Sequence, residues 1–486
     1  MAPLNALARR TAVRHAEPPG AAKSRPDALL WAIALMIWTS VWRIQDLVPI
    51  VGLLKLNLLA TALALGLFVI DRDPARRTGW LQPAMVVCAV GLLCMSILGI
   101  PTSLWPRNSF MALVRELVPN LLLMGLLAAS VRSLRDLEWL GVVMVLGACV
   151  YSLFALLRFG VDASGRLGDM AYYDANDLAL VLLCTIPIAL YLLLRGGWRR
   201  RLLAASSLAL MGITFVESGS RGGFIALIAV LAFFLVAYRP IAPRVRLLAV
   251  LGGFGLFTII AGESYWTKIR TLGDLQNDYN WSGRAPEGRM EVWRRGLGYL
   301  GDNPVLGLGL RNFSLAEGML SEEAKARMER GRGFKWSAAH NSWLELGAEL
   351  GVLGLLFFVG LLGYAFLALR RISRGPELSE APTFGAVAWA CTLSASLVGF
   401  CVAGSFISAE HFAVLYIVLG FTMALAKLQT LDAVHALDWS DADPPAAPDE
   451  RFRGTGARRE PRRRPARVSA RHGALVAREP VNRFRP

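Results

Sequence analysis

The stretch HNSWLELGAELGVLGLLFFVGLLGYAFLAL, residues 340–369, decides how this chain folds. A polar segment ends at its first residues, and a strongly apolar run follows. A helix needs about 20 apolar residues to cross the ~30 Å hydrocarbon core of a bilayer. Because lipid cannot satisfy backbone N–H and C=O groups, such a run crosses as a helix. The stretch therefore predicts a membrane-spanning helix over 342–369.

The same pattern recurs along the chain. Hydrophobic residues make up 55% of the 486 residues, charged residues 18%, and the mean hydropathy is +0.46. Apolar blocks of about 17–25 residues are separated by short basic segments, without the period-two pattern of a membrane barrel. We therefore predict an all-α, polytopic membrane protein of about twelve transmembrane helices. The predicted spans are 28–44, 48–70, 80–100, 109–130, 137–157, 176–195, 201–217, 220–238, 246–263, 342–369, 382–404 and 409–427.

Arginine placement predicts the orientation, because cytoplasmic loops carry an excess of positive charge. One set of alternate loops is rich in arginine, whereas the other short loops hold Arg43, Arg107 and little else. We predict that the first set is cytoplasmic, together with a basic arm at 1–27 and a disordered basic tail at 428–486. The net charge of +16 therefore indicates topology in a lipid bilayer and not a nucleic-acid partner. The first set holds Arg72, Arg76, Arg77, Arg132, Arg135, Arg195, Arg199, Arg200, Arg201, Arg239, Arg244, Arg246, Arg370, Arg371 and Arg374.

Residues 264–341, here called the long loop, are the one large insertion predicted between spans, on the non-cytoplasmic side. They separate the membrane segments 28–263 and 342–427. Long loops are uncommon and often carry function. We predict helical content in this loop, in two segments.

The first loop helix is predicted from four residues that recur at helical spacing, Met290, Trp293, Leu297 and Leu300. The second is predicted from Ser314 and Glu317, which fit a capping box. The long loop is therefore expected to form a small helical lid over the membrane domain.

Arg221 follows the turn VESGS at 216–220 and begins the eighth predicted span. A cation in the first helical turn opposes the helix dipole by about 0.3–1 kcal/mol, so an anionic partner is expected. A helix N-terminus, a guanidinium fork and adjacent glycines suit a phosphate or diphosphate group. The alternative is an interfacial arginine paired with Glu217.

Two arginines stand near the start of the first loop helix. Arg289 lies one turn before Trp293 and can point toward the membrane surface, and Arg284 is a rival for the same role. The alternative for both is a solvated helix face.

His340 and Asn341 stand where the long loop enters the membrane. Asn341 can cap the following helix, and a neutral imidazole can act as a base toward a hydroxyl group. The alternative is a capped helix start with an exposed histidine. Glu345 and Glu349 follow one turn apart, and carboxylates at this depth must face protein or a water-filled cavity. They are expected to pair with an arginine or to hold His340 in place.

Asp174 and Asp177 stand at the start of the sixth predicted span. Helix capping explains them, and binding acceptor hydroxyls or orienting an arginine is the alternative. No metal-ligand set and no cofactor motif is found, so the sequence predicts neither a metal nor a cofactor.

Four motifs occur in an order that resembles the O-antigen ligase and polymerase superfamily of bacterial membrane glycosyltransferases. The resemblance covers about 174–360. The motifs are ANDLAL at 175–180, SGSRGGFIAL at 218–227, GRMEVWRRGLGYLGDNPVLGLGLRNF at 288–313 and HNSWLELGAELGVLG at 340–354.

The resemblance implies a donor, an undecaprenyl-diphosphate-linked glycan at the periplasmic face of the bacterial inner membrane. It implies transfer to an acceptor hydroxyl without a metal or a nucleotide sugar. The matched positions imply that Arg221 and Arg289 hold the diphosphate and that His340 assists the acceptor, with Arg284 the rival of Arg289. The acceptor stays open among a lipid A core, another glycan and a protein. A polysaccharide polymerase is the alternative within the family, and a polysaccharide or amphiphile transporter is the alternative from another class.

Overall fold

The computed structural model describes residues 26–160, 166–168, 172–274, 276–375 and 381–441. Within these residues every regular element is a helix. The predicted basic arm lies almost wholly outside the described part, as does most of the predicted tail. Contacts divide the chain into the units Met1–His435 and Ala436–Pro486, and the helices below belong to the first unit except for the end of α20. The last of them, α20, runs to Asp441 and so passes the predicted end at 427.

Nine helices in the described part are long and apolar enough to cross a membrane, and three shorter apolar helices fall on the other predicted spans. The prediction of a polytopic all-α membrane protein is confirmed, and the count of twelve crossings stays a prediction. The helices are α2 (Ala28–Trp42), α5 (Leu56–Ile70), α6 (Pro83–Leu98), α7 (Pro106–Ala112) continuing through the π-helical η3 (Leu113–Leu117) into α8 (Val118–Ser130), α9 (Leu134–Phe154) with η4 (Ala155–Phe159), α10 (Ala175–Arg195), α11 (Trp198–Ser218), α12 (Arg221–Ala237), α13 (Pro243–Ile260), α18 (Ser342–Ser373), α19 (Ala381–Ala403) and α20 (Ala413–Asp441).

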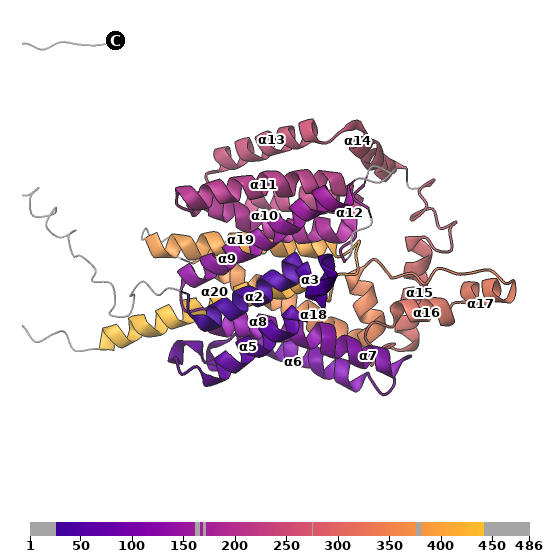
Figure 1. The fold of residues 1–486 in the computed structure, drawn as a ribbon, viewed down its shortest axis with the longest axis horizontal. Helices are drawn as coiled ribbons and strands as arrows, with labels where there is room; N and C mark the ends of the chain where they lie inside the picture. Colours follow the sequence, from indigo (N-terminus) through magenta and orange to yellow (C-terminus); the bar gives the residue numbers. More distant parts are fainter. Residues whose placement is uncertain (1–25, 161–165, 169–171, 275, 376–380, 442–486) are drawn as a thin grey trace, which may run out of the picture. The chain divides into compact units, whose positions relative to one another are not determined.

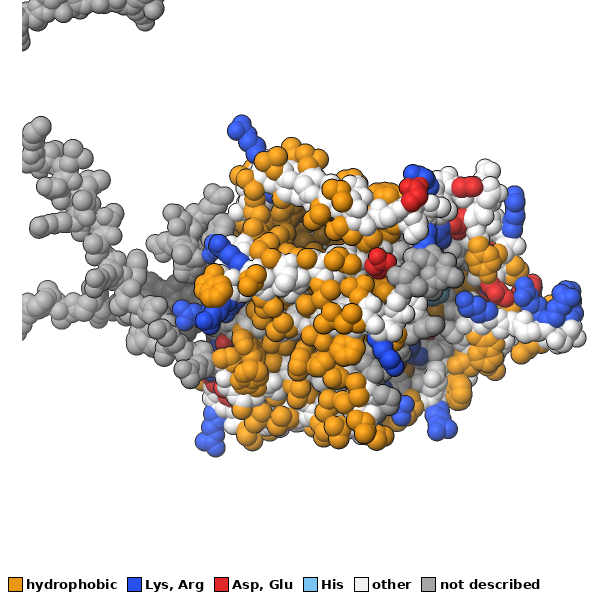
Figure 2. All heavy atoms as spheres, turned by 45° about the horizontal axis from the view of Figure 1, so that its top comes forward, with side chains coloured by type: hydrophobic (Ala, Val, Ile, Leu, Met, Phe, Trp, Pro, Cys, Tyr) orange, Lys and Arg blue, Asp and Glu red, His pale blue; other side chains and the backbone are white. Residues whose placement is uncertain are grey.

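These helices lie side by side, and the helices of the long loop gather beyond one end of them (Figure 1). We call this end of the bundle the loop end. Hydrophobic side chains cover the middle of the visible surface, and blue and red side chains gather toward the ends (Figure 2). An apolar band between two polar ends is the pattern that a bilayer requires.

Short elements connect the helices at both ends. At the loop end, α3 (Ile44–Leu47) and α4 (Pro49–Gly52) lead into α5. The 3₁₀ turns η1 (Pro74–Arg76) and η2 (Thr78–Trp80) connect α5 to α6 at the opposite end.

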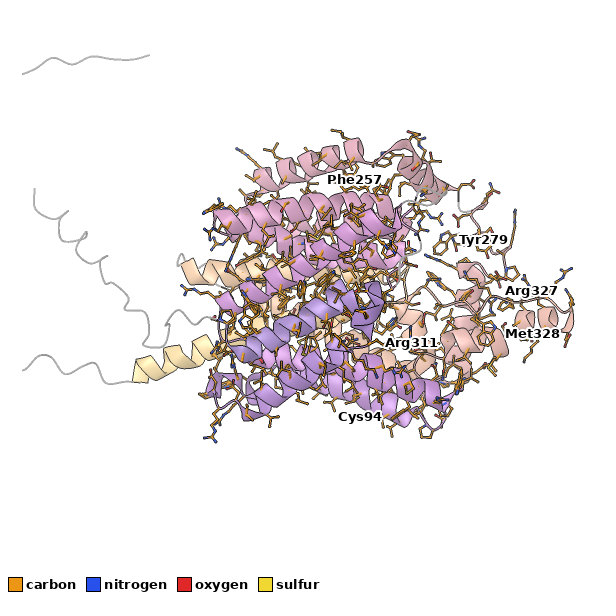
Figure 3. All side chains as sticks on the ribbon, viewed as in Figure 1. Cys94, Phe257, Tyr279, Arg311, Arg327 and Met328 are labelled. Atoms are coloured by element: carbon orange, nitrogen blue, oxygen red, sulfur yellow. The ribbon has the colours of Figure 1, made fainter. Side chains whose placement is uncertain are left out.

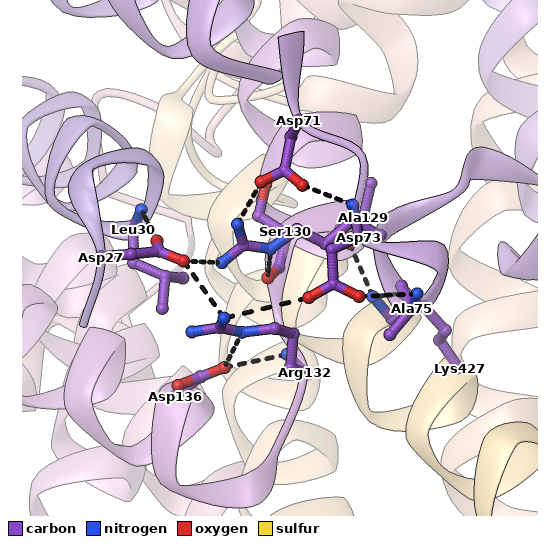
Figure 4. Close-up of polar contacts among 11 residues, drawn as sticks. Asp27, Leu30, Asp71, Asp73, Ala75, Ala129, Ser130, Arg132, Asp136 and Lys427 are labelled. Atoms are coloured by element: carbon purple, nitrogen blue, oxygen red, sulfur yellow. Dashed lines mark hydrogen bonds and ion pairs between the residues drawn. The ribbon is translucent and has the colours of Figure 1, made fainter. Parts of the chain in front are cut away.

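Charged side chains join several helices at the end opposite the long loop (Figure 4). The Arg76 side chain is 4% exposed, forms ion pairs with Asp27 and Asp71, and donates to the Ser130 carbonyl at the end of α8. Lys427 of α20 donates to the Ala129 carbonyl at 2.7 Å. These cations donate hydrogen bonds to carbonyl groups that have no helical partner because they lie in the last turn of α8. Arg132 also forms an ion pair with Asp27. Arg76 and Arg132, which the sequence assigned to basic loops, therefore form ion pairs that connect the ends of the helices.

The long loop contains α14 (Glu263–Arg270), η5 (Thr271–Gly273), α15 (Arg289–Asp302), α16 (Phe313–Met319) and α17 (Glu322–Glu329). The first predicted loop helix corresponds to α15. Met290 and Leu297 are exposed, whereas Val292, Gly296 and Tyr299 are buried. The predicted capping box at Ser314 is wrong, because α16 begins one residue earlier without a side-chain cap.

A kink in α18 attaches the long loop to the membrane domain. Gly351 has φ 70° and ψ −178°, which interrupts the helical hydrogen bonds. The freed carbonyls of Ala348 and Glu349 accept from the N–H groups of Leu308 (2.9 Å) and Gly309 (2.8 Å). The loop thus satisfies backbone groups that a kink would otherwise leave unpaired in a buried place.

Candidate functional site

A cavity of about 580 Å³ lies at the loop end, and we call it the Arg221 cavity. The N-termini of α10 and α12, the long loop and the segment after α19 all contribute to it. Its lining residues are Arg166, Asn176, Gly219, Arg221, Gly222, Ile225, Leu272, Asn280, Trp281, Arg289 and Phe406. The structure therefore brings together two of the three arginines that the sequence singled out, and it adds a third, Arg166.

Arg221 is the first residue of α12, and the Ser220 side chain caps that helix by accepting from Gly223 N–H at 3.0 Å. The guanidinium forms an ion pair with Asp278 of the long loop and donates to Thr271 Oγ1 at 3.0 Å. The expected alternative partner, Glu217, has no such contact among those described. Burial raises the pKa of Asp278, but the hydrogen bonds from Arg221 and from Asn280 N–H outweigh it and leave this pKa lowered.

Arg166 was missed by the sequence reading. Its Nε donates to the Ser218 carbonyl at 3.2 Å, and its Nη2 donates to Asn176 Oδ1 at 3.1 Å. Asn176 Oδ1 also accepts from Ser220 Oγ at 2.9 Å. These bonds join the start of α10 to the turn before α12 and fix a second cation beside Arg221. The only sequence signal was an arginine in a polar segment on the same side as Arg221.

Arg289, the first residue of α15, is half-buried. Among the described residues, no hydrogen bond or ion pair engages its guanidinium. Burial lowers the pKa of Arg289, and the nearby positive charge of Arg221 lowers it further. A half-buried cation beside other cations is unfavourable without an anion, because desolvation and like-charge repulsion act together. The cavity therefore presents a guanidinium that is ready for an anionic ligand.

Arg284 lies elsewhere. Its side chain is exposed and lines a different cavity of about 550 Å³, together with acidic residues such as Glu291, Glu322 and Glu323. Of the two rival arginines, the structure brings Arg289 and not Arg284 to Arg221.

His340 has φ 48°, an unusual backbone angle for a residue other than glycine, and its neighbours hold that angle. The His340 N–H donates to Ser408 Oγ at 3.0 Å. Ser408 in turn donates to the Glu345 carboxylate, which also accepts from Ala339 N–H at 3.1 Å. Strained residues persist only where such surroundings fix them, and they concentrate at functional sites.

Trp293 links this turn to the Arg221 cavity. Its Nε1 donates to the Ala339 carbonyl at 2.8 Å. The N–H and the C=O of Ala339 are therefore both hydrogen-bonded. Its ring meets the edge of Trp281, a cavity residue, with ring centroids 5.3 Å apart. Helix α15 thus carries Arg289 at its start and orients the His340 turn one helical turn later.

The His340 imidazole is poised to be neutral. Burial lowers the pKa of His340 from 6.5 to about 4, and the positive charge of Arg289 contributes to the shift. A neutral imidazole at ordinary pH can accept a proton. His340 itself is not among the residues that line the Arg221 cavity.

Asp174, Asp177 and Asn341 act as helix caps. Asp174 and Asp177 form a capping box at the start of α10, and Asp174 Oδ1 accepts from Asn176 N–H at 2.7 Å. Asn341 Oδ1 accepts from Trp343 N–H and Leu344 N–H at the start of α18. The capping explanation therefore holds for all three residues, and Asp174 in addition influences the charge at His340.

The two glutamates of α18 do not pair with Arg221 or Arg289. Glu345, 3% exposed, holds the His340 turn, as the sequence reading expected in one of its alternatives. Glu349 accepts from Arg311 N–H at 2.7 Å and from Phe313 N–H at 3.0 Å, and so anchors the long loop. In the described part, no group of three or more His, Cys, Asp or Glu could hold a metal ion. A reaction without a metal stays a prediction.

Residues 206–359 match the family model described as O-antigen ligase. A Rickettsia conorii protein, provisionally named a polysaccharide ligase, is 25% identical over 260 residues, and the alignment spans 51% of this chain and 58% of that protein. The segment 206–359 is therefore similar to the O-antigen ligase family, and the chain spans little more than half the length of the curated relative that it matches. This segment contains Arg221, Arg289 and His340, whereas Arg166 and Asp174 precede it.

Proposed function

We propose that this membrane protein transfers a glycan from an undecaprenyl-diphosphate-linked donor to an acceptor hydroxyl, in the manner of an O-antigen ligase. The reaction takes place at the loop end, which we assign to the periplasmic face of a bacterial inner membrane. The donor's lipid tail stays in the bilayer, and its diphosphate occupies the Arg221 cavity.

The observation that carries this proposal is Arg289. Its half-buried guanidinium has no hydrogen-bonded or ion-paired partner among the described residues, and Arg221 and Arg166 line the same cavity. A diphosphate supplies the charge that this arrangement lacks, and guanidinium groups bind phosphate oxygens in a two-pronged manner. The cavity also lies at the N-terminus of α12, where backbone N–H groups favour an anion.

The chemistry follows from these charges. The acceptor oxygen attacks the anomeric carbon of the glycan, and the bond from that carbon to the diphosphate oxygen breaks. The leaving diphosphate keeps the electron pair and gains negative charge. Fixed cations stabilise this developing charge more in the transition state than in the ground state, which lowers the barrier. Attack from the face opposite the leaving group inverts the anomeric configuration.

His340 receives the proton of the attacking hydroxyl. Its lowered pKa keeps the imidazole neutral before the reaction, so it is available as a base. As the diphosphate binds, negative charge beside Arg289 raises the proton affinity of the ring. The base therefore becomes stronger when the donor is in place.

The experiment uses the full chain purified in detergent, with an undecaprenyl-diphosphate-linked glycan and EDTA present. Three acceptors are offered separately: lipid A core, a second lipid-linked glycan and a serine- or threonine-containing peptide. We expect a glycosylated product and released undecaprenyl diphosphate with one of them, which identifies the acceptor. No product with any acceptor, together with flux of unchanged glycan across liposomes, would support a transporter instead.

A further inference from the structure

A second cavity of about 450 Å³ lies at the loop end, and we call it the Arg311 cavity. It combines the start of the α7–η3–α8 span, the connector before α16, and the first two turns of α18. Its lining residues are Asn108, Met111, Ala112, Arg115, Glu116, Arg311, Ser314, Ala338, Glu345 and Glu349. No lining residue is common to this cavity and the Arg221 cavity.

The chain holds Arg311 rigidly in this cavity. Arg311 has φ 62°, and the Glu349 carboxylate accepts from its N–H at 2.7 Å. Asn108 donates to the Arg311 carbonyl at 2.7 Å. The guanidinium lies 3.3 Å from Glu116 and 3.5 Å from the His411 ring. Figure 3 shows Arg311 close to the helix ends, whereas Arg327 and Met328 lie farther out on α17.

Several polar groups of the Arg311 cavity have unused hydrogen-bonding capacity. Glu116 Oε2 is buried and forms an ion pair with Arg311 Nε at 3.3 Å, but it has no hydrogen bond in the described part. Arg115 has no hydrogen bond or ion pair among the described residues. Both belong to η3, a π-helical segment, and such segments occur frequently at functional sites. In a small adjoining cavity that also touches Glu116, Glu410 is 3% exposed and its Oε2 likewise has no hydrogen bond.

The wall of this cavity is also the support of His340. Ala338, two residues before His340, lines the cavity. The Glu345 carboxylate lines it too, and it holds both Ala339 N–H and the Ser408 hydroxyl that binds His340 N–H. His340 in turn responds to the charge of Arg289, which lines the Arg221 cavity. His340 itself lines neither cavity, but its supporting residues Ala338 and Glu345 line the Arg311 cavity, and Trp293 connects Ala339 to Trp281 of the Arg221 cavity.

We propose that the Arg311 cavity binds the sugar end of the acceptor, an uncharged and hydroxyl-rich saccharide, next to the His340 turn. This inference rests on the proposed function, because it assigns the second substrate of the same reaction. Carboxylates accept hydrogen bonds from sugar hydroxyls, and guanidinium and amide groups donate to them. Three carboxyl groups and two guanidinium groups line the cavity, so it offers both acceptors and donors to the hydroxyl groups of a saccharide.

The binding test uses a neutral trisaccharide, maltotriose carrying a diazirine, and the full purified chain. After irradiation, we expect mass spectrometry to locate the label in 108–116 and 311–314. Arg115→Gln and Glu116→Gln should each reduce that label several-fold. Arg107→Gln is the matched control, because Arg107 is exposed on the same helix and lines neither cavity. Excess inorganic pyrophosphate should not compete.

The kinetic test uses the acceptor that is active in the transfer assay. Arg115→Gln should raise the KM for that acceptor about tenfold while the KM for the donor is unchanged. Absence of label, label confined to the Arg221 cavity, transfer to the peptide alone, or an unchanged acceptor KM would each overturn the inference. Transfer by the unaltered chain together with any of these results would leave the proposed function standing. Label in the Arg311 cavity without transfer to any acceptor would instead overturn the proposed function.

Discussion

Arg221, which lines the Arg221 cavity as the first residue of α12, forms an ion pair with Asp278 of the long loop. The Arg221 side chain is 28% exposed and that of Asp278 is 8% exposed, so the pair is partly shielded from water. The Asp278 carboxylate is thus bound to the Arg221 guanidinium, which we expect to bind the donor diphosphate. Donor binding must replace or share this contact.

Asp278→Asn should strengthen donor binding. The substitution removes a negative charge that competes with the diphosphate, and it keeps the size of the side chain. We expect the donor KM to fall by about three- to tenfold, since charge-assisted hydrogen bonds contribute about 1.5–3 kcal/mol and only part of that is released. Inhibition of transfer by inorganic pyrophosphate should strengthen in parallel.

The matched control for this change is Asp274→Asn. Asp274 is exposed on the same loop and binds Asn277, not Arg221. A donor KM that responds equally to both substitutions, or that rises with Asp278→Asn, would show that Asp278 supports the site and does not compete with the donor.

The acid limb of the profile of kcat/KM against pH should lie at unusually low pH. His340 must be neutral to accept a proton, and its pKa is lowered to about 4 in the free protein. We therefore expect kcat/KM to stay constant from pH 7 down to about 5 and to fall only near pH 4. Bound diphosphate adds negative charge, so the limb of kcat should lie at higher pH than that of kcat/KM. An acid limb of kcat/KM at the ordinary histidine value of 6.5 would contradict this assignment.

The same shift has a consequence for stability. Because the folded pKa lies below the unfolded value of 6.5, the unfolded chain binds the proton first as the pH falls. The contribution of neutral His340 to stability is therefore complete above pH 6.5 and is lost between 6.5 and about 4. His340→Gln should flatten this part of the curve of melting temperature against pH.

Gly351→Ala should destabilise the protein by at least about 2 kcal/mol. The φ of 70° is unfavourable for alanine, and the added Cβ would collide with the Val305 carbonyl oxygen. Gly363→Ala in the same helix is the control, because nothing lies within 4 Å of its added Cβ. Thermal unfolding in detergent should show a lower melting temperature for the first variant only. Equal melting temperatures would mean that the kink does not attach the long loop to α18.

Much of the fold could be predicted from sequence because each signal was local. Apolar run length located the helices, and the caps at Ser220, Asp174 and Asn341 follow from side chains that bind backbone within three residues. The order of the motifs pointed to Arg221, Arg289 and His340. Their roles stay predictions, although the structure brings them to one region.

The remaining features depend on contacts between segments far apart in the chain. Nothing near Asp278 in the sequence indicates that it meets Arg221, 57 residues earlier. The support of His340 by Ser408 is of the same kind, because the two partners lie 68 positions apart in the sequence. The apolar spacing around Met290 predicted α15 but not its buried face, because α16 and α18 decide which side of that helix is covered.

The most direct test compares Arg289→Gln with Arg284→Gln in the reconstituted transfer reaction. The two residues are five positions apart on the same loop, but only Arg289 lines the Arg221 cavity. We predict that Arg289→Gln lowers kcat/KM for the undecaprenyl-diphosphate donor by about 10²–10³, the typical loss when a fixed transition-state donor is removed. Arg284→Gln should remain within about twofold of the unaltered chain. Full transfer by the Arg289 variant, or an equal loss in both, would contradict the assignment of the diphosphate to this cavity.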